Sequence, residues 1–395
     1  MGALLALVLA SLSLVFVASA VVTGRAQVRA LVRVDPAPLA EPLLVVIPAR
    51  NEAARIGATL RALLSEDARA GLRVLVVDDR STDDTARVVA AVASADIARA
   101  DVAGAGAAGR VRILALSDEP PAGTFGKPRA LHAAVEDARA RGELTARVMF
   151  LDADVVLAPG ALGGMLRAKA ASGAAALSGV PRLVCATAVE QMLVPAFASV
   201  VTGRFLPTRV HDPARPDAFL NGQLVLVDTA ALDDAGGWAA VSSTVLEDVA
   251  LARNLKARGH ALRLADLRAL ASTRMYDSWR AIDEGFGKNA TALLGERAGL
   301  VGALAFMTSL LPWAAAALAI GALTVDAHTD AVYAGAALAL VAAVHALQAS
   351  ARRTARVSVW PVLVLPLVYA AVAFTLVRAS LRRTIAWRGR VYPRA

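Results

Sequence analysis

Cysteine, histidine, lysine and aromatic residues are all scarce in this 395-residue chain. Its single cysteine, Cys185, excludes an intramolecular disulfide and any zinc site built from clustered cysteines. The five histidines lack zinc-binding spacing, and only four of the 42 basic residues are lysine. In contrast, 57% of the residues are hydrophobic and the mean hydropathy is +0.55. These values exclude a mostly disordered chain, and they are too apolar for an ordinary soluble domain alone.

The N-terminal 22 residues, Met1 to Val22, form an unbroken apolar run that is long enough to cross a bilayer. Arg25, Arg29 and Arg33 follow this run, whereas a signal peptide carries its positive charge before the apolar segment. We therefore expect a retained transmembrane anchor over residues 1–22, with the following residues on the cytoplasmic side. The alternative is a cleaved leader that ends near Ala18–Ala20.

Three further apolar runs lie near the C-terminus, at about 300–325, 330–349 and 357–378. They predict about three transmembrane helices within residues 299–380. Pro361 and Pro366 interrupt the last run, so a re-entrant or interfacial segment is the alternative there. A basic amphipathic tail is expected over residues 381–395. Strict alternation would place this tail outside the cell, against the charge rule, so its side stays open.

The formal net charge of +9 belongs to the borders of the apolar segments. Residues 25–34, 351–356 and 378–395 hold twelve arginines and no acidic residue, which leaves −3 for the rest of the chain. An arginine next to an anionic membrane surface gains about 1 kcal/mol. A nucleic-acid-binding protein would carry its basic patch on the folded domain. We therefore expect the membrane as a partner and no nucleic acid.

The middle of the chain, residues 40–298, has the pattern of an α/β domain with a mostly parallel, doubly wound sheet. A helical pattern over residues 52–65 and a capped helix after Ser81–Asp84 separate short apolar strands. The Gly/Ala-rich stretch 102–109 is expected to be a loop insertion. The expected strands are Leu43–Ile47, Arg73–Val77, Val111–Leu116 and Arg147–Leu151.

Acidic residues follow three of these strands, at the sheet edge where doubly wound folds bind ligands. Glu52 follows the first strand, Asp78 and Asp79 end the second, and Asp152-Ala-Asp154 ends the fourth. Carboxylates gathered at one edge repel one another unless a cation or a donor-rich ligand lies between them. In an extended segment, Asp152 and Asp154 point to the same side and can hold a hard divalent cation. A dinucleotide site is excluded because no glycine fingerprint follows the first strand.

The order of these motifs resembles the family 2 inverting glycosyltransferases, nucleotide-sugar enzymes with the GT-A fold. The resemblance covers roughly residues 40–290 and depends on several motifs that occur in the same order. These are Pro48-Ala-Arg-Asn-Glu52, Val77-Asp-Asp79, Gly126-Lys127, Leu151-Asp-Ala-Asp154, Asn221-Gly-Gln223, Gly236-Gly-Trp238 and Glu247-Asp248.

The resemblance implies a nucleotide-sugar-binding set made of Glu52, Asp78, Asp79, Lys127 and Asp152. Asp78 and Asp79 would contact the nucleoside, with Glu52 on the same side, and Lys127 would be a cation near the nucleotide. Simpler interpretations are a strand-end turn for the two aspartates and a solvated loop charge for Lys127.

The resemblance also implies a divalent metal, Mn²⁺ or Mg²⁺, that Asp152 and Asp154 would hold against the diphosphate. Asp248 would be the general base on the acceptor hydroxyl, since inversion needs one base opposite the leaving group. Glu247, Asn221 and Gln223 would lie on the acceptor side. The alternative for the Glu247-Asp248 pair is a helix N-terminus, where the helix dipole favours acidic residues.

One motif of many membrane-bound members, Gln/Arg-x-x-Arg-Trp, is not intact here. Trp279 with Arg280, or Trp387 with Arg390, are candidates for its place at the acceptor site, although their order is reversed. The apolar segment 189–206 is predicted to be an interfacial helix beside the site, with a buried core helix as the alternative.

Among these enzymes, the layout is most similar to the carotenoid (diaponeurosporenoate) and hopanoid-associated glycosyltransferases. The resemblance implies transfer from a nucleotide-diphosphate sugar, expected to be a UDP-hexose, to a hydroxyl or carboxyl of a lipid. The catalytic domain would lie at the cytoplasmic leaflet of the cell membrane, with no protein partner evident. The alternatives are a polyprenyl-phosphate or polysaccharide-forming family 2 transferase, or a catalytically silent membrane scaffold with the same fold.

Overall fold

The computed structural model describes the chain except for residues 67–70, 103–108, 326–327, 383, 388–389 and 394–395, so most of the expected loop insertion lies outside it. The helices are α1 Gly2–Ala30, α2 Ile56–Leu63, α3 Thr85–Val102, α4 Gly126–Ala140, α5 Ala161–Ala171, α6 Ala188–Arg204, α7 Pro207–Val210, α8 Thr229–Asp234, α9 Glu247–Ala257, α10 Trp279–Leu294, α11 Ala298–Val325, α12 His328–Thr354 and α13 Leu365–Leu381. The strands are β1 Val32–Arg33, β2 Leu43–Ala49, β3 Leu72–Asp78, β4 Val111–Ala115, β5 Arg147–Leu151, β6 Val155–Leu157, β7 Ala176–Val180, β8 Arg182–Leu183, β9 Leu224–Asp228, β10 Leu262–Asp266, β11 Ala271–Thr273, β12 Thr384–Trp387 and β13 Arg390–Pro393.

The catalytic-domain candidate is built on an eight-stranded sheet in the order β1-β10-β7-β9-β5-β2-β3-β4. All neighbours are parallel except β9, which runs antiparallel to both β5 and β7. This confirms the mostly parallel α/β sheet. The four predicted strands lie within two residues of β2, β3, β4 and β5.

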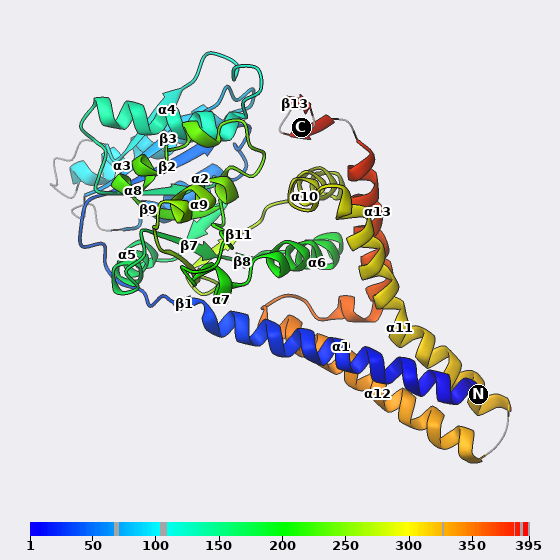
Figure 1. The fold of residues 1–395 in the computed structure, drawn as a ribbon. Helices are drawn as coiled ribbons and strands as arrows, with labels where there is room; N and C mark the ends of the chain where they lie inside the picture. Colours follow the sequence, from blue (N-terminus) through cyan, green and yellow to red (C-terminus); the bar gives the residue numbers. More distant parts are fainter. Residues whose placement is uncertain (67–70, 103–108, 326–327, 383, 388–389, 394–395) are drawn as a thin grey trace.

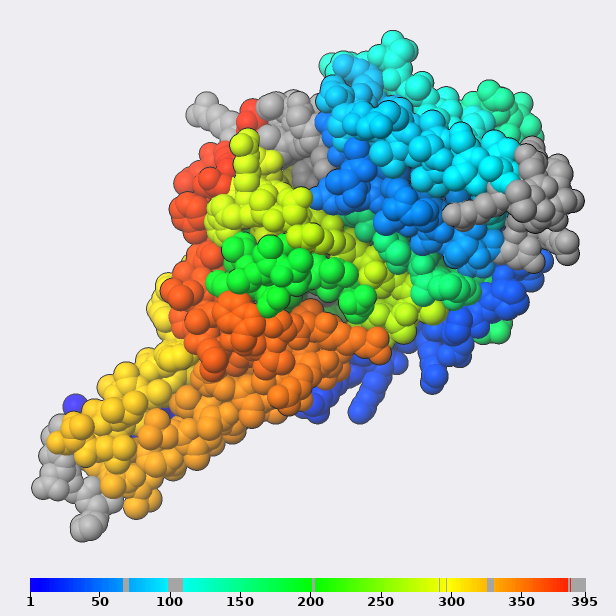
Figure 2. Space-filling view, turned by 180° about the vertical axis from the view of Figure 1, so that it is seen from behind, coloured from blue at the N-terminus to red at the C-terminus, as the bar shows by residue number. Residues whose placement is uncertain are grey.

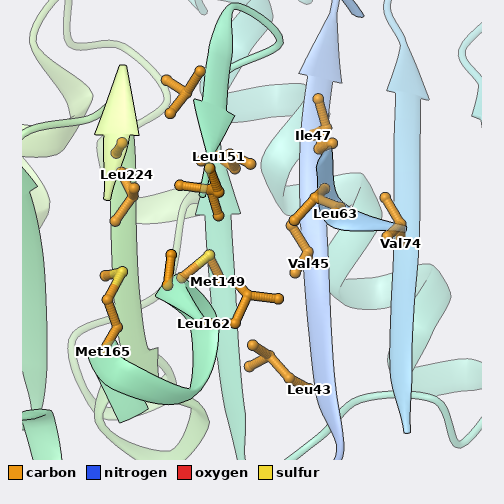
Figure 3. Close-up of a cluster of buried hydrophobic side chains, with 14 of the residues drawn as sticks. Leu43, Val45, Ile47, Leu63, Val74, Met149, Leu151, Leu162, Met165 and Leu224 are labelled. Atoms are coloured by element: carbon orange, nitrogen blue, oxygen red, sulfur yellow. The ribbon is translucent and has the colours of Figure 1, made fainter. Parts of the chain in front are cut away.

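Alternate side chains of the central strands enter two separate cores, one on each face of the sheet. Val45 and Ile47 pack into the core beneath α2 and α5, which Figure 3 shows, whereas Leu44 and Val46 pack under α4 and α9. All four side chains are at most 1% exposed. Burial on both faces explains why these strands are continuous apolar runs rather than alternating ones.

The cap of α3 differs from the sequence expectation in which Ser81 caps the helix. The carboxylate of Asp83 accepts hydrogen bonds from the backbone N–H of Thr85 (3.0 Å) and from its hydroxyl (2.5 Å). Ser81 instead accepts a bond from the backbone N–H of Asn51, 3.0 Å away. Ser81 therefore joins two loops at the end of the sheet, whereas Asp83 caps α3, which begins directly after the Ser81–Asp84 segment as expected.

Within the described residues, four helices are long and apolar enough to cross a membrane: α1, α11, α12 and the segment Trp360–Leu381 that contains α13. The first three pack together and extend away from the sheet domain, as Figures 1 and 2 show. Small residues let the helices approach closely, as is usual for membrane helices. The alanines at this interface are fully buried: Ala6, Ala10, Ala315, Ala319, Ala334 and Ala337.

Helix α13 lies beside the first part of α11 and against α6 and α10, which lie between it and the sheet domain (Figure 1). A Cβ atom on Gly302 of α11 would lie 2.9 Å from the Cα of Ala373 of α13, which shows how closely the two helices meet. Strands β12 and β13 follow as an antiparallel hairpin, and β12 contacts α10. The C-terminal segment expected to be an amphipathic tail therefore contains a β-hairpin near the sheet domain.

The predicted interfacial segment 189–206 forms most of helix α6. Its buried residues Leu193, Val194 and Phe197 pack with Phe286 of α10 and Val372 of α13. The Phe197 and Phe286 rings are stacked with centroids 4.8 Å apart. Helix α6 therefore packs on α10 through an aromatic contact and on α13 through apolar side chains.

Candidate active site

The predicted acidic residues come together because the ends of the parallel strands meet the beginning of the antiparallel strand β9. Leu151, the last residue of β5, pairs with Leu224, the first residue of β9. The backbone N–H of Asp152 consequently donates to the carbonyl of Gln223 at 2.9 Å. The Asn221-Gly-Gln223 turn thus lies directly beside the Asp152-Ala-Asp154 turn, although about 70 residues separate them in the sequence.

A cavity of about 1160 Å³ opens at this edge of the sheet. It extends from the acidic residues to the helices at both ends of the chain, including α1, α6, α12 and α13. The predicted residues that line it are Glu52, Asp79, Lys127, Asp152, Asp154, Asn221, Gln223, Glu247 and Asp248. A polar reaction centre and an apolar chamber therefore share one space.

Lys127, in the first turn of α4, lies between the two acidic motifs. Its Nζ is 2.7 Å from Oδ1 of Asp152 and 3.3 Å from Oε1 of Glu247, and it donates to the carbonyl of Gly222 at 3.1 Å. Burial acts against its charge, but the neighbouring carboxylates raise its pKa well above the ordinary lysine range. Lys127 is therefore a fixed cation of the site rather than a solvated loop charge.

Asp248 lies in the first turn of α9 and is held by the glycine turn at Gly222. Its Oδ2 accepts from the backbone N–H of Gly222 at 2.8 Å, and its Oδ1 from that of Val249 at 2.8 Å. Burial, together with the charge of Glu247, raises the pKa of Asp248 to about 6, while Lys127 opposes the rise. Such a carboxylate can accept a proton near neutral pH, as a general base must.

The first two motifs form one hydrogen-bonded loop pair at the ends of β2 and β3. Arg50 donates to the carbonyls of Asp79 (2.7 Å) and Arg80 (3.1 Å), and Asn51 accepts from the backbone N–H of Thr82 at 2.8 Å. Asn51 and Arg80 both have positive φ, at 55° and 59°, which is uncommon for residues other than glycine. The loop pair therefore holds the buried Asp79 at the wall of the cavity.

Three of the predicted residues take part mainly in local structure. Asp78 accepts from the backbone N–H of Ser81 at 2.9 Å and is not among the residues that line the cavity. The amide of Asn221 donates to the carbonyl of Gly179 at 2.9 Å, and that of Gln223 to Thr273 Oγ1 at 3.4 Å. Asp78 thus supports the strand-end turn, while Asn221 and Gln223 shape the wall beside Asp152.

The Asp152-Ala-Asp154 segment is a turn and not the extended segment that the sequence predicts, because the backbone N–H of Val155 donates to the carbonyl of Asp152 at 3.2 Å. Both carboxylates nevertheless line the cavity. Within the described residues, no three His, Cys, Asp or Glu side chains converge on a metal position. Two carboxylates fit Mg²⁺ or Mn²⁺ only when phosphate oxygens and water complete the ligand set, as is usual at nucleotide sites.

Of the two tryptophan–arginine candidates, the first lies outside the cavity lining. Trp279 begins α10 and is 37% exposed, and Arg280 pairs with Glu284 at 2.9 Å; neither lines the cavity. Trp387 and Arg390 pair with each other across the β12–β13 hairpin. Their part in acceptor binding stays a prediction.

Lys288 and Tyr276 line the cavity, although the sequence suggested no individual role for either. Lys288 lies on α10. Burial and the charge of Lys127 lower its pKa, and the charges of Glu247, Asp248 and Asp152 oppose this shift without cancelling it. Tyr276 packs so closely on α10 that a Cβ on Gly285 would be 2.3 Å from its hydroxyl oxygen. The sequence signals at these residues are the Arg274-Met-Tyr276 and Gly285-Phe-Gly-Lys-Asn289 patterns, and neither pattern carries chemistry without the fold.

Comparison with known proteins agrees with this geometry. Residues 40–283 match the family described as Glycosyltransferase like family 2. Among solved structures, the mannosyltransferase PcManGT from Pyrobaculum calidifontis, in complex with GDP-Man and Mn²⁺, is similar at 20% identity and a TM-score of 0.53; the match covers 95% of this chain and 99% of that chain. Its TM-score supports a shared fold.

Two weaker likenesses belong to other glycosyltransferase structures. Glucosyl-3-phosphoglycerate synthase from Mycobacterium tuberculosis, in complex with Mg²⁺ and UDP, has 16% identity and a TM-score of 0.40, over 64% of this chain and 78% of that chain. S. aureus TarS has 15% identity and a TM-score of 0.40, over 63% and 40%. No curated protein matches the chain in sequence. Since the family match covers more than half of its residues, the chain belongs to the family 2-like glycosyltransferases and is an enzyme with the GT-A fold.

Proposed function

We propose that this enzyme is a membrane-bound inverting glycosyltransferase that moves a hexose from a UDP-sugar to a hydroxyl or carboxyl group of a lipid. The observation that carries the proposal is the cavity, because it joins the acidic residues at the sheet edge to the apolar helices α1, α6, α12 and α13. A soluble acceptor would need no such apolar chamber. The resemblance to carotenoid and hopanoid-associated enzymes is consistent with a lipid acceptor.

In this mechanism Asp248 accepts the proton of the acceptor hydroxyl through one of its carboxylate oxygens. The acceptor oxygen attacks the anomeric carbon while the bond from that carbon to the diphosphate oxygen breaks on the opposite face. The backbone N–H groups of Gly222 and Val249 orient the carboxylate of Asp248. Burial holds the pKa of this carboxylate near the working pH, which favours proton transfer in the transition state.

The donor would lie along the ends of β2, β3 and β5, with Glu52 and Asp79 on the nucleoside side. Asp152 and Asp154 would hold a divalent metal, which when bound supplies positive charge to the departing diphosphate. Lys127, fixed 2.7 Å from Asp152, orients that carboxylate and adds a second positive charge. Lys288 on α10 would add a third from the other wall.

The membrane part of the proposal is supported by composition and packing. The outward surfaces of α1, α11 and α13 carry exposed large hydrophobic residues, among them Leu12, Leu304 and Leu367 at 57%, 56% and 65% exposure. Arginines gather where these helices meet the sheet domain, which favours the cytoplasmic side for that domain. The cavity would then open to the cytoplasmic leaflet of the cell membrane.

The direct test is sugar transfer from radiolabelled nucleotide sugars to native membrane lipids by the full-length enzyme with Mn²⁺. UDP-glucose, UDP-GlcNAc and GDP-mannose should be compared. Asp248→Asn should lower the rate about 10²–10⁴-fold, because it removes the base and keeps the shape. Asp233→Asn is the matched control, since Asp233 lies exposed on α8 and pairs only with Arg139.

Equal lipid labelling by the wild type and Asp248→Asn would show that the base is assigned wrongly. If no donor labels the lipids while water-soluble acceptors are labelled, the proposal of a lipid acceptor is wrong. In contrast, labelled lipid with UDP-glucose alone would support both the donor and the acceptor class.

A further inference from the structure

Polar residues on α1 and α12 form one part of the cavity wall, away from the strand ends that carry the acidic motifs. Arg25 of α1 and Gln348 and Arg352 of α12 line it. Arg25 donates to the hydroxyl of Ser350 at 3.0 Å, which joins the two helices at this level. Gln348 and Arg352 are four residues apart, so they lie on the same face of the helix. This group of three is called the arginine end of the cavity below.

The charges of the arginine end are not neutralised by acidic side chains. Arg352 donates to two backbone carbonyls, those of Ser358 (2.5 Å) and Gln191 (2.7 Å). Throughout the described part of the chain, neither Arg25 nor Arg352 forms an ion pair. Arg268, which also lines the cavity, differs because Asp266 accepts two hydrogen bonds from it, at 2.6 and 2.8 Å.

The amide of Gln348 supports a polar occupant at this place. Its Oε1 is buried, and no hydrogen-bond partner for it occurs among the described residues. The two guanidinium groups without an acidic partner match a phosphate or carboxylate ligand, which accepts charge-assisted hydrogen bonds from arginine. The Oε1 of Gln348 can only accept a hydrogen bond, so it matches a hydroxyl or N–H of the same occupant. This part of the cavity wall is therefore built for the polar part of a ligand and not for an apolar chain.

The opposite end of the cavity constrains the nucleophile. A general base helps a neutral hydroxyl, which must lose a proton to attack, and is not needed by a phosphate or carboxylate that is already ionised. Asp248 therefore indicates a hydroxyl nucleophile, and the anionic group recognised by the arginine end must be a different part of the same acceptor.

We propose that the acceptor is an anionic lipid with a free hydroxyl, whose phosphate or carboxylate is held by Arg25 and Arg352 while its hydroxyl reaches Asp248. This deepens the proposed function and depends on it for the transfer step. The lipid chains would leave between α1, α12 and α13, whose outer surfaces are apolar. Transfer joins the hydroxyl oxygen to the anomeric carbon, releases the nucleoside diphosphate, and leaves the proton on Asp248.

Binding tests the arginine end without any transfer. Detergent-solubilised full-length enzyme is titrated with phosphatidylglycerol (phosphate and hydroxyl), phosphatidic acid (phosphate, no hydroxyl) and diacylglycerol (hydroxyl, no charge), and bound lipid is counted by native mass spectrometry. The wild type should bind both anionic lipids more tightly than diacylglycerol. Arg352→Gln and Arg25→Gln should each weaken anionic lipid binding about tenfold, and Arg352→Lys should restore part of it.

Each variant has a matched control on the same helix that removes the same charge outside the cavity. Arg353→Gln is the control for Arg352, and Arg29→Gln for Arg25, since both control residues are exposed and neither lines the cavity. If the controls weaken binding as much as Arg352→Gln and Arg25→Gln do, the arginines attract membrane lipid in general and the proposal is wrong. Displacement of phosphatidylglycerol by millimolar inorganic phosphate would equally overturn it in favour of a free anion.

Transfer kinetics separate this inference from the proposed function. With a lipid that accepts sugar, Arg352→Gln should raise KM for an anionic acceptor by about tenfold and leave KM for diacylglycerol unchanged. If sugar reaches neutral and anionic hydroxyl lipids alike in both proteins, the inference fails while the proposed function stands. If no lipid is labelled but the binding pattern holds, the arginine end is confirmed as an anionic-lipid site and the proposed function fails.

Discussion

Lys127 holds together two carboxylates that have different tasks in the proposed mechanism. It lies 2.7 Å from Asp152, on the donor side, and 3.3 Å from Glu247, next to the base Asp248. A lysine in that position lowers the pKa of Asp248, while burial and Glu247 raise it, and the second influence is larger. The balance of these charges decides at which pH the base is ionised.

Activity should consequently depend on pH through Asp248. Because its pKa is raised to about 6, kcat/KM should be constant above that pH and fall about tenfold per pH unit below it, as the carboxylate becomes protonated and can no longer accept a proton. The measurement is a pH profile of sugar transfer between pH 4.5 and 8, with folding monitored at each pH. A profile of the same shape in Asp248→Asn would assign the titration to another group.

Gly222 should not tolerate a side chain. A Cβ atom there would lie 2.6 Å from Oδ2 of Asp248, so Gly222→Ala should push the base away and cost about 100-fold in kcat with little loss of donor binding. Gly335→Ala, on α12 with open space around its Cβ position, is the control and should keep normal activity. Steady-state kinetics together with a nucleotide-binding measurement distinguish misplacement from unfolding.

At the scale of elements, α10 connects the chemistry to the C-terminal helices. It carries Phe286 and Lys288 to the cavity, and its Asp283 forms ion pairs with Arg378 of α13 and with Arg382 just beyond it. The side chain of Asp283 is 3% exposed, whereas the arginines are about 40% exposed. Helix α13 therefore holds α10 in place through a carboxylate that is buried between them.

Removing that carboxylate should loosen the wall of the cavity. Asp283→Asn should destabilise the fold by about 1–3 kcal/mol, towards the lower value because water can reach the arginines. The neighbouring Glu284→Gln breaks the exposed pair with Arg280 and should change stability by less than about 0.5 kcal/mol. Thermal unfolding in detergent compares the two, and equal shifts would contradict a special role for Asp283.

At the scale of the whole molecule, the position of α13 indicates on which side of the membrane the C-terminus lies. Helices α1, α11 and α12 extend away from the sheet domain, whereas α13 lies beside α6 and α10 and leads to a hairpin near that domain (Figure 1). We infer that three helices cross the membrane and that α13 lies at the interface. The C-terminus and the sheet domain would then share one side.

Cysteine labelling tests this topology in a Cys185→Ser background. Arg33→Cys and a cysteine added after Ala395 should both be protected from a membrane-impermeant maleimide in intact cells and should react after permeabilisation. Asp330→Cys, near the start of α12, should react in intact cells. A C-terminal cysteine that reacts in intact cells would show that α13 also crosses the membrane.

The amino-acid sequence by itself determined the α/β class, the apolar ends and the order of acidic motifs, because these depend on local periodicity and on residues next to one another. Only the tertiary structure decided which acids meet. Antiparallel pairing of β9 brings Gly222 beside Asp152, α4 inserts Lys127 between the acids, and α12 delivers Arg352 to the same cavity. The residues brought together are about 25 to 200 positions apart, and no local pattern encodes such pairing. The turn at Asp152-Ala-Asp154 has the same cause, since packing between distant elements overrode the extended form that the local sequence favours.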